Sequence, residues 1–127
     1  MTGGPQKAVV LAAGLGTRLR PLTLAWPKPL MTLWNVPLLE HSLRMLETWG
    51  VEEIAVNLHW QPEKIQAWLT ARNGRARLRV SYEPEILGTG GALRPLKDFL
   101  CDAPFWVVNA DIAAALEPQP LLDAFAA

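Results

Sequence analysis

Cysteine is almost absent from this sequence, since Cys101 is the only one. A single cysteine excludes an intrachain disulfide and a thiolate metal cluster, and it fits a reduced, cytoplasmic setting. Long apolar runs are absent as well, because no stretch approaches the roughly 18 consecutive apolar residues of a membrane-spanning helix. The N-terminal stretch has one lysine and a short apolar run that stops at Gly14, which predicts a first strand and not a signal peptide. We therefore expect a cytoplasmic protein with no membrane partner.

The sequence also lacks a net charge at neutral pH, because 12 basic residues balance 12 acidic ones. No global field therefore favours nucleic acid or a membrane surface as a partner. Locally, residues 1–39 contain no Asp or Glu, while four basic residues fall within them: Lys7, Arg18, Arg20 and Lys28. Such a segment suits a polyanionic ligand such as a triphosphate, although a chance run of solvated charges explains the same pattern.

The composition is globular, with half of the 127 residues hydrophobic and 19% charged. No repeat, low-complexity tract or linker divides the chain, so we expect one domain over residues 1–127. Short apolar or alternating runs predict strands at residues 7–13, 53–58, 77–82 and 105–110. Helical spacing with start and stop signals predicts helices at residues 37–50, at 62–74, from the glycine-rich turn 87–91 to Leu100, and from Pro118 onward.

This alternation of strand and helix predicts an α/β sandwich with a mainly parallel sheet. Ligands of such sheets lie beyond the carboxyl ends of the strands, where we expect three groups: Gly14, the pair His59 and Trp60, and Asp111. The arginines around the third strand, at 72, 75, 77 and 79, have no aromatic platform among them, so we interpret them as a solvated strand edge. The fourth strand leaves an open edge, which favours self-association into a homo-oligomer.

The loop from Leu11 to Leu30 contains the most informative residues. Gly14 and Gly16 lack a Cβ, so the backbone there can turn tightly and bring its N–H groups onto phosphate oxygens. Arg18 offers a planar fork for bidentate phosphate contacts, and Lys28 offers a mobile point charge. Two other phosphate loops fail on spacing: a dinucleotide fingerprint needs glycine where this chain has Leu19, and the G-K-[ST] of a P-loop is absent.

Three segments together resemble a known family. The loop is similar to the G-x-G-T-R and P-K-P signature of sugar-1-phosphate nucleotidyltransferases, which make NDP-sugars from an NTP and a sugar 1-phosphate. Residues 85–93 (EILGTGGAL) resemble the family's segment beside the nucleobase, and residues 109–111 (NAD) resemble the motif whose Asp binds Mg²⁺. The motifs are most similar to those of mannose-1-phosphate guanylyltransferase-like enzymes, heptose-1-phosphate guanylyltransferases and N-acetylmuramate-1-phosphate uridylyltransferases. The resemblance spans residues 7–125 and implies a Rossmann-like three-layer sandwich.

The resemblance also implies roles for individual residues. Arg18 is expected at the β and γ phosphates and the departing pyrophosphate, Lys28 at the α-phosphate or the incoming sugar phosphate, and Asp111 at Mg²⁺. The other expected nucleotide-binding residues are Leu11, Ala12, Ala13, Gly14, Gly16, Thr17, Gly88, Gly90 and Asn109.

Several other polar or aromatic residues have a plainer interpretation. Glu83 and Glu85 are interpreted as loop residues, with Glu85 at most an acceptor for a base edge, because attack by a dianionic phosphate needs no general base. His59 has no second ligand at metal spacing and is expected in packing or on a polar rim. The sequence leaves open whether Trp26 and Trp60 border the pocket.

Relatives in this family are considerably longer, and their second half supplies most of the sugar pocket and a further acidic metal ligand. The sequence therefore predicts half of an active site. The leading hypothesis is a nucleotidyltransferase domain that uses Mg²⁺, with GTP or UTP as the favoured NTP. The alternative is a catalytically silent nucleotide-binding or interaction module of the same fold. A dinucleotide-dependent oxidoreductase is disfavoured by Leu19.

Overall fold

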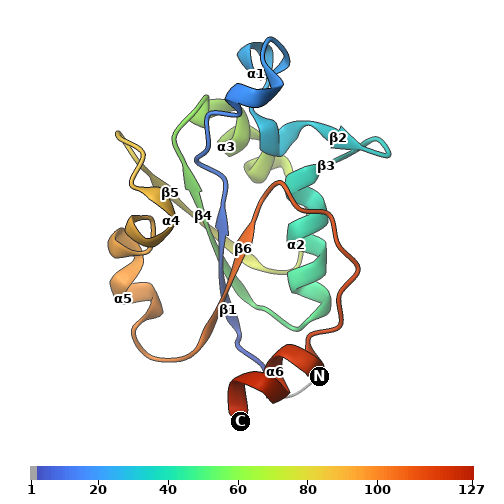
Figure 1. Ribbon diagram of the computed structural model, residues 1–127, viewed down its shortest axis with the longest axis vertical. Coiled ribbons are helices and arrows are strands. Elements are labelled where there is room, and N and C mark those ends of the chain that lie inside the picture. The colour runs from blue at the N-terminus through green and yellow to red at the C-terminus, as the bar shows by residue number, and fades with distance from the viewer. Residues whose placement is uncertain (1–2) are drawn as a thin grey trace.

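A four-stranded parallel sheet forms the centre of the molecule (Figure 1). The computed structural model describes residues 3–127, so residues 1 and 2 of the expected domain lie outside the described residues. The strands are β1 (Lys7–Leu11), β4 (Glu53–Leu58), β5 (Arg77–Tyr82) and β6 (Phe105–Asn109), in the order β5-β4-β1-β6. Every neighbouring pair is parallel, which confirms the predicted α/β fold.

Helices cover both faces of this sheet, giving three layers (Figure 1). One face carries α2 (Leu38–Thr48) and α3 (Pro62–Ala71), and the other carries α4 (Gly88–Gly91), the 3₁₀ turn η3 (Arg94–Leu96) and α5 (Lys97–Leu100). The last helix, α6 (Gln119–Ala126), begins after Pro118 as predicted. Between β1 and α2 lie only short elements: η1 (Thr17–Leu19), α1 (Leu22–Ala25), η2 (Lys28–Leu30), and a small hairpin of β2 (Thr32–Leu33) and β3 (Val36–Pro37).

Alternation along β1 divides the core into two clusters of unequal size. Ala8 and Val10 point to the α2–α3 face, where the larger cluster includes fully buried Leu43 and Ile65. Val9 points to the other face and joins a smaller cluster, whose remaining buried members are Ala55, Leu96, Phe99 and Leu100. Because successive strand residues face opposite sides, a strand buried on both faces has a continuous apolar sequence.

Two predicted helices differ from the structure. The helix expected from the turn 87–91 to Leu100 is broken into α4, η3 and α5, because three glycines and Pro95 within it favour turns over a continuous helix. The helix expected to end at Asn73–Gly74 ends instead at Ala71, because Arg72 adopts an extended backbone with φ −68° and ψ 136°.

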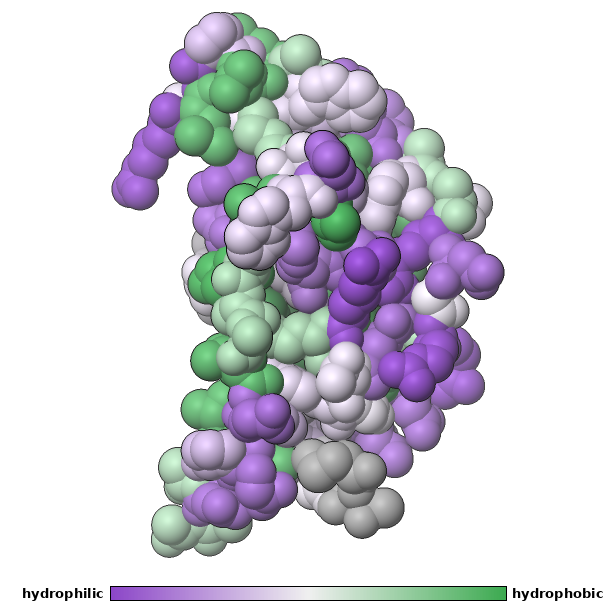
Figure 2. Space-filling model, turned by 90° about the vertical axis from the view of Figure 1, so that its right-hand side faces the viewer, coloured by the Kyte–Doolittle hydropathy of each residue, from purple (hydrophilic) through white to green (hydrophobic). Residues whose placement is uncertain are grey.

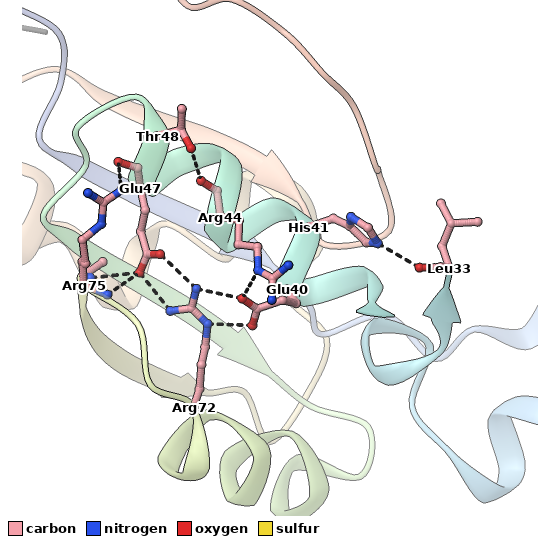
Figure 3. Close-up of polar contacts among 9 residues, drawn as sticks. Leu33, Glu40, His41, Arg44, Glu47, Thr48, Arg72 and Arg75 are labelled. Carbon is pink, nitrogen blue, oxygen red and sulfur yellow. Dashed lines mark hydrogen bonds and ion pairs between the residues drawn. The ribbon is translucent and has the colours of Figure 1, made fainter. Parts of the chain in front are cut away.

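The prediction of a solvated strand edge is wrong for Arg72, because its side chain is only 5% exposed. It bridges α3 to two carboxylates on α2 (Figure 3): its Nε donates to Glu40 at 2.8 Å and its Nη1 donates to Glu47 at 2.9 Å. Glu47 also accepts hydrogen bonds from the backbone N–H groups of Arg75 and Ala76, both at 2.9 Å. This Arg72 cluster therefore ties α2, α3 and the approach to β5 together.

Hydrogen bonding also sets the pKa values in the cluster. The side-chain hydrogen bond from Arg72 lowers the pKa of Glu47 from 4.5 to about 2; burial opposes this shift, and the backbone N–H groups reinforce it. Burial lowers the pKa of Arg72, but hydrogen bonds to Glu47 and Glu40 outweigh it and raise that pKa. Arg72 and Glu47 are therefore charged at neutral pH.

The β6 edge of the sheet is open in the described part of the chain, where β6 pairs with β1 alone. Val107 in the middle of β6 is 43% exposed, and the segments after β6 carry further exposed apolar side chains: Ile112, Leu116, Leu121 and Phe125. Figure 2 shows hydrophobic residues gathered along one margin of the molecule. Among residues 3–127, no helix combines the length and the apolar character needed to cross a membrane.

Candidate functional site

A cavity of about 400 Å³ opens at the carboxyl ends of the strands. The segments that follow β1, β5 and β6 contribute to its wall, and so does Asn57 within β4, as expected for a ligand site in a parallel sheet. Its lining residues are Leu11, Ala12, Ala13, Gly14, Gly16, Lys28, Pro29, Asn57, Glu83, Ile86, Gly88, Thr89, Asn109, Ala110 and Asp111.

The loop after β1 owes its shape to Gly16. This glycine has a left-handed φ of +63°, and a Cβ built on it would lie 2.6 Å from Cγ2 of Thr23. Thr23 is buried, and its hydroxyl donates to the Gly16 carbonyl oxygen at 2.7 Å. Glycine is therefore required at position 16 for both conformation and space. Gly14, by contrast, is open on its Cβ side, which leaves room for a ligand.

Lys28 and Asp111 meet at the cavity although 83 residues separate them in the sequence. Lys28 begins the 3₁₀ turn between Pro27 and Pro29, and Asp111 follows β6. The Lys28 Nζ lies 2.9 Å from the Asp111 Oδ2, and both side chains are partly exposed. An ammonium and a carboxylate thus face the same space.

Two buried polar residues at the cavity, Asn57 and Glu83, were not among the predicted site residues. Asn57 is buried near the end of β4, and its Oδ1 accepts a hydrogen bond from the Ala12 backbone N–H at 2.6 Å. Glu83, expected as a loop residue, is only 1% exposed, and its Oε1 accepts a hydrogen bond from Asn57 Nδ2 at 2.9 Å. The sequence did carry a signal for both residues: Asn57 is an amide inside the apolar run 53–58, and Glu83 is an acid directly after an edge strand. Both are residue types that rarely become buried without a partner.

Most of the predicted site residues line this cavity: Leu11, Ala12, Ala13, Gly14, Gly16, Lys28, Gly88, Asn109 and Asp111. The structure does not bring Thr17, Arg18 and Gly90 to the lining. Thr17 and Arg18 follow the left-handed Gly16 into the turn η1, and the Arg18 side chain extends into solvent there. The roles assigned to all of these residues stay predictions.

The aromatic and histidine candidates lie outside the cavity lining. The indole N–H of Trp60 donates to the Thr23 carbonyl oxygen at 2.8 Å. This side chain therefore holds the loop between β1 and α2 from outside the cavity. Trp26 is exposed beneath the ammonium of Lys64, at 5.0 Å from the ring centroid. His59 donates from Nδ1 to the Glu83 carbonyl oxygen at 2.7 Å, because a carbonyl oxygen only accepts. His59 therefore packs against the rim, as the sequence indicated.

Asp111 is the residue of this cavity whose carboxylate could coordinate a magnesium ion. Within residues 3–127, no group of three or more His, Cys, Asp or Glu is arranged to hold a metal. Mg²⁺ does not need such a cage, because it binds one or two carboxylates and completes its shell with phosphate oxygens and water. The donor set therefore fits Mg²⁺ carried by a nucleotide better than a metal held by protein alone.

Comparisons with known proteins agree with this geometry. A family model described as "Nucleotidyl transferase" matches residues 7–127. Mannose-1-phosphate guanylyltransferase 1 of Arabidopsis thaliana is 37% identical over 122 residues, covering 92% of this chain and 34% of the relative. Mannose-1-phosphate guanyltransferase of Yarrowia lipolytica is 37% identical over 110 residues, covering 84% of this chain and 30% of the relative.

Solved structures show the same fold. HddC from Yersinia pseudotuberculosis superposes with a TM-score of 0.80 at 30% identity, covering 94% of this chain and 53% of that one. HddC in complex with GMP-PN gives a TM-score of 0.81 at 28% identity, with the same coverage of 94% and 53%. The chain thus spans about a third of the length of these curated relatives and about half of these solved chains. It belongs to the nucleotidyl transferase family, and it corresponds to the N-terminal part of the sugar-phosphate nucleotidyltransferases.

Proposed function

We propose that residues 1–127 form the nucleotide-binding part of a nucleotidyltransferase domain that binds an NTP with Mg²⁺ and transfers the nucleotidyl group to a sugar 1-phosphate, releasing pyrophosphate. The observation that carries the proposal is the cavity in which Gly14, Lys28 and Asp111 meet at the carboxyl edge of the sheet. This edge collects backbone groups, the ammonium of Lys28 and the partly exposed carboxylate of Asp111, which suit a triphosphate that carries a metal.

The chemistry needs positioning and charge neutralisation more than proton transfer. A sugar phosphate is already mostly dianionic at neutral pH, because its second pKa is near 6. The residues of this chain therefore have to hold an anion in line with the α-phosphorus of a polyanion. We expect Lys28 to leave Asp111 and to neutralise the α-phosphate or the acceptor phosphate. Arg18 is assigned to the outer phosphates from η1. Backbone groups of residues 11–14 and the turn at Gly88 hold the nucleoside.

Asp111 would hold the magnesium ion, together with phosphate oxygens and water. When bound, Mg²⁺ supplies charge neutralisation at the phosphate oxygens and orients them. Asp111 pairs with Lys28 in this structure, so binding of the metal–nucleotide exchanges one ion pair for two new ones.

GTP is the first nucleotide to test, with UTP second. The relatives at 37% identity are named guanylyltransferase and guanyltransferase, and the HddC complex contains GMP-PN. Thermal-shift titration of GTP, UTP, CTP, ATP and dTTP with Mg²⁺ measures the choice directly, since a ligand that binds only the folded state raises its melting temperature. We expect the largest rise with GTP and its loss in Asp111→Ala. The matched control is Glu117→Gln, an exposed acid outside the cavity, which keeps the rise. No shift with any of the five NTPs contradicts the proposal.

Nucleotide binding without turnover is the second candidate. The sequence left this alternative open, and the ion pair of Asp111 with Lys28 at 2.9 Å is compatible with it. Incubation with GTP, Mg²⁺ and a panel of sugar 1-phosphates, with pyrophosphate as the readout, separates the two candidates. Release of pyrophosphate that depends on a sugar phosphate supports transfer, and binding without release supports the silent module.

Self-association is the partner interaction that we propose for the open edge. The strand β6 has the sequence FWVVN, with no charged side chain to block pairing with another strand. Two copies joined antiparallel across β6 satisfy the open backbone groups of both. Light scattering after size exclusion is expected to show a dimer at high concentration, and Val107→Lys is expected to return the monomer. A chain that is monomeric at all concentrations rejects this partner.

A further inference from the structure

The short helix α1 ends on three carbonyl oxygens that a helix of its length cannot pair internally. It lies at the end of the molecule beyond the carboxyl ends of the strands (Figure 1). Two of the backbone positions that would pair with these oxygens in a longer helix are Pro27 and Pro29, which carry no N–H. A four-residue helix is also too short to be stable by itself. Groups from elsewhere in the chain must therefore hold α1.

Three side chains around the start of α3 supply the missing donors. They donate to the three carbonyl oxygens in order along the chain: Trp60 Nε1 to Thr23 at 2.8 Å, Gln61 Nε2 to Leu24 at 2.8 Å, and Lys64 Nζ to Ala25. The Lys64 ammonium also lies 5.0 Å from the centroid of the Trp26 ring, so it contacts the residue that follows α1. Trp60, Gln61 and Lys64 form what we call the α1 clamp.

Thr23 connects the α1 clamp to the cavity. Its carbonyl oxygen accepts from Trp60, and its own hydroxyl donates to the Gly16 carbonyl oxygen at 2.7 Å. A Cβ built on Gly16 would lie 2.6 Å from Thr23 Cγ2 and 3.3 Å from Lys28 Cβ. Gly16 and Lys28 line the cavity, whereas Thr23 and the clamp residues do not. A shift of α1 therefore moves two lining residues, although the clamp itself lies outside the cavity.

We propose that the residues of the α1 clamp are positioning residues, which act through Thr23 to place Gly16 and Lys28 for the phosphates of a bound NTP. The inference rests on the proposed function, because it assigns this side of the cavity to the phosphates.

Burial of apolar surface does not explain why α1 is held. Leu22 is 64% exposed, Leu24 is 55% exposed and Trp26 is 56% exposed, so this segment adds little to the core. Three side-chain hydrogen bonds converge on a segment whose main buried residue is Thr23, the one that touches Gly16. The clamp therefore fixes the loop more than it stabilises the core.

Gln61 has two features that cost stability. Its backbone is left-handed, with φ 46° and ψ 52°, and its Oε1 is buried without a hydrogen-bond partner in the described part of the chain. A non-glycine residue in this conformation is strained, and an unpaired buried oxygen adds to the cost. Such strain persists only where the surrounding structure requires it. At this position, it directs the Gln61 amide toward α1 while Pro62 begins α3.

The first test removes one donor from the clamp. Trp60→Phe keeps an aromatic ring and loses the N–H, so Mg²⁺–GTP binding is expected to weaken about threefold to tenfold in calorimetry. The matched control is Trp49→Phe, because the Trp49 indole also donates to a backbone carbonyl oxygen, that of Leu116 at 3.0 Å, away from the cavity. This control is expected to lower the melting temperature with GTP affinity unchanged. Equal effects of the two variants on affinity overturn the proposal.

The second test separates positioning from stability. Gln61→Gly relieves the left-handed strain and removes the amide donor, so the two effects on stability oppose each other. The melting temperature is expected to stay close to that of wild type, while Mg²⁺–GTP affinity falls about threefold. A purely structural role predicts that affinity follows the melting temperature. Unchanged affinity in a folded Gln61→Gly variant therefore overturns the proposal, even if Trp60→Phe fails to fold.

Hydrogen exchange reports on the clamp without any ligand. The Trp26 backbone N–H donates to the Leu22 carbonyl oxygen at 3.2 Å, and its exchange is expected to accelerate in Trp60→Phe and Gln61→Gly but not in Trp49→Phe. Unchanged exchange in both clamp variants overturns the link through α1.

The two proposals fail in different ways. If wild type binds GTP, and the clamp variants loosen α1 without weakening that binding, the positioning role fails and the proposed function stands. If wild type binds none of the NTPs, the proposed function fails and the positioning role fails with it, while the exchange pattern still shows whether the clamp holds α1.

Discussion

The two faces of the sheet handle buried carboxylates in opposite ways. On the α2–α3 face, Glu40 and Glu47 are neutralised by Arg72 and lie beside the larger apolar cluster. On the α4–α5 face, Glu83 meets only an amide and a backbone N–H, beside a smaller cluster and a cavity. A buried charge needs partners on either face. The first face satisfies its charges by ion pairing and supports stability, whereas the second leaves room for a ligand.

This difference predicts where the chain tolerates change. A closed cluster has no free group to offer a ligand, so its loss should lower the free energy of unfolding and spare nucleotide binding. The face covered by short helical pieces should show the reverse, because it forms little of the core and, in the proposed function, its backbone positions the nucleotide.

The largest effect is expected from Arg72→Met. It removes the partner of two buried carboxylates, and breaking a buried pair in this way costs about 3–5 kcal/mol. Urea denaturation measures the loss, and Mg²⁺–GTP affinity of the folded fraction should stay unchanged. Adding Glu40→Gln and Glu47→Gln to the same chain should recover much of the stability. A loss below about 1 kcal/mol in Arg72→Met would remove the distinction between the faces.

Core truncation gives the next effect. Leu43→Ala, in the larger cluster, should cost about 2–5 kcal/mol, because a fully buried leucine leaves a cavity. Leu96→Ala, in the smaller cluster, should fall at the lower end of that range, since the short helices around it can collapse into the space. Thermal unfolding of both variants compares them, and equal losses would argue that the two clusters contribute alike.

Acid should weaken the α2–α3 face in a defined pH window. The folded-state pKa of Glu47 is about 2, below its ordinary 4.5. A depressed carboxyl pKa contributes stability that is complete well above pH 4.5 and is lost as the pH falls toward 2, because the unfolded state binds the proton first. Between these pH values, the free energy of unfolding should therefore fall less steeply in Glu47→Gln than in wild type. Parallel pH dependences would assign the acid sensitivity to other groups.

The two loop glycines should give the smallest effect on stability and the clearest contrast. Gly16→Ala forces a side chain into a left-handed conformation against Thr23, at a cost of about 1–2 kcal/mol. Gly14→Ala meets nothing within 4 Å, so the melting temperature should stay close to wild type while Mg²⁺–GTP binding weakens. Thermal shift with and without nucleotide measures both. A Gly14→Ala variant that binds normally would remove the close approach proposed for that backbone.

Much of the fold was predictable because its signals are local. The apolar runs that became β1, β4 and β6, and the helical spacing of α2, α3 and α6, each depend on residues close together in sequence. The broken segment from Gly88 to Leu100 was predicted as one helix, although its glycines and Pro95 argued against it. The end of α3 was misplaced because Arg72 leaves the helix to reach Glu40 and Glu47, which lie 32 and 25 residues earlier.

By itself, the sequence determined the parallel α/β class, the glycine turn after β1 and the family to which the chain belongs. Short-range spacing is enough for these, because backbone conformation and motif chemistry depend on near neighbours. Only the tertiary structure decided that Lys28 meets Asp111, that Arg72 is buried, and that Glu83 joins Ala12 to Leu87 through Asn57. These contacts join residues from different strands and loops, and the sheet order that brings them together is set by packing of the whole chain.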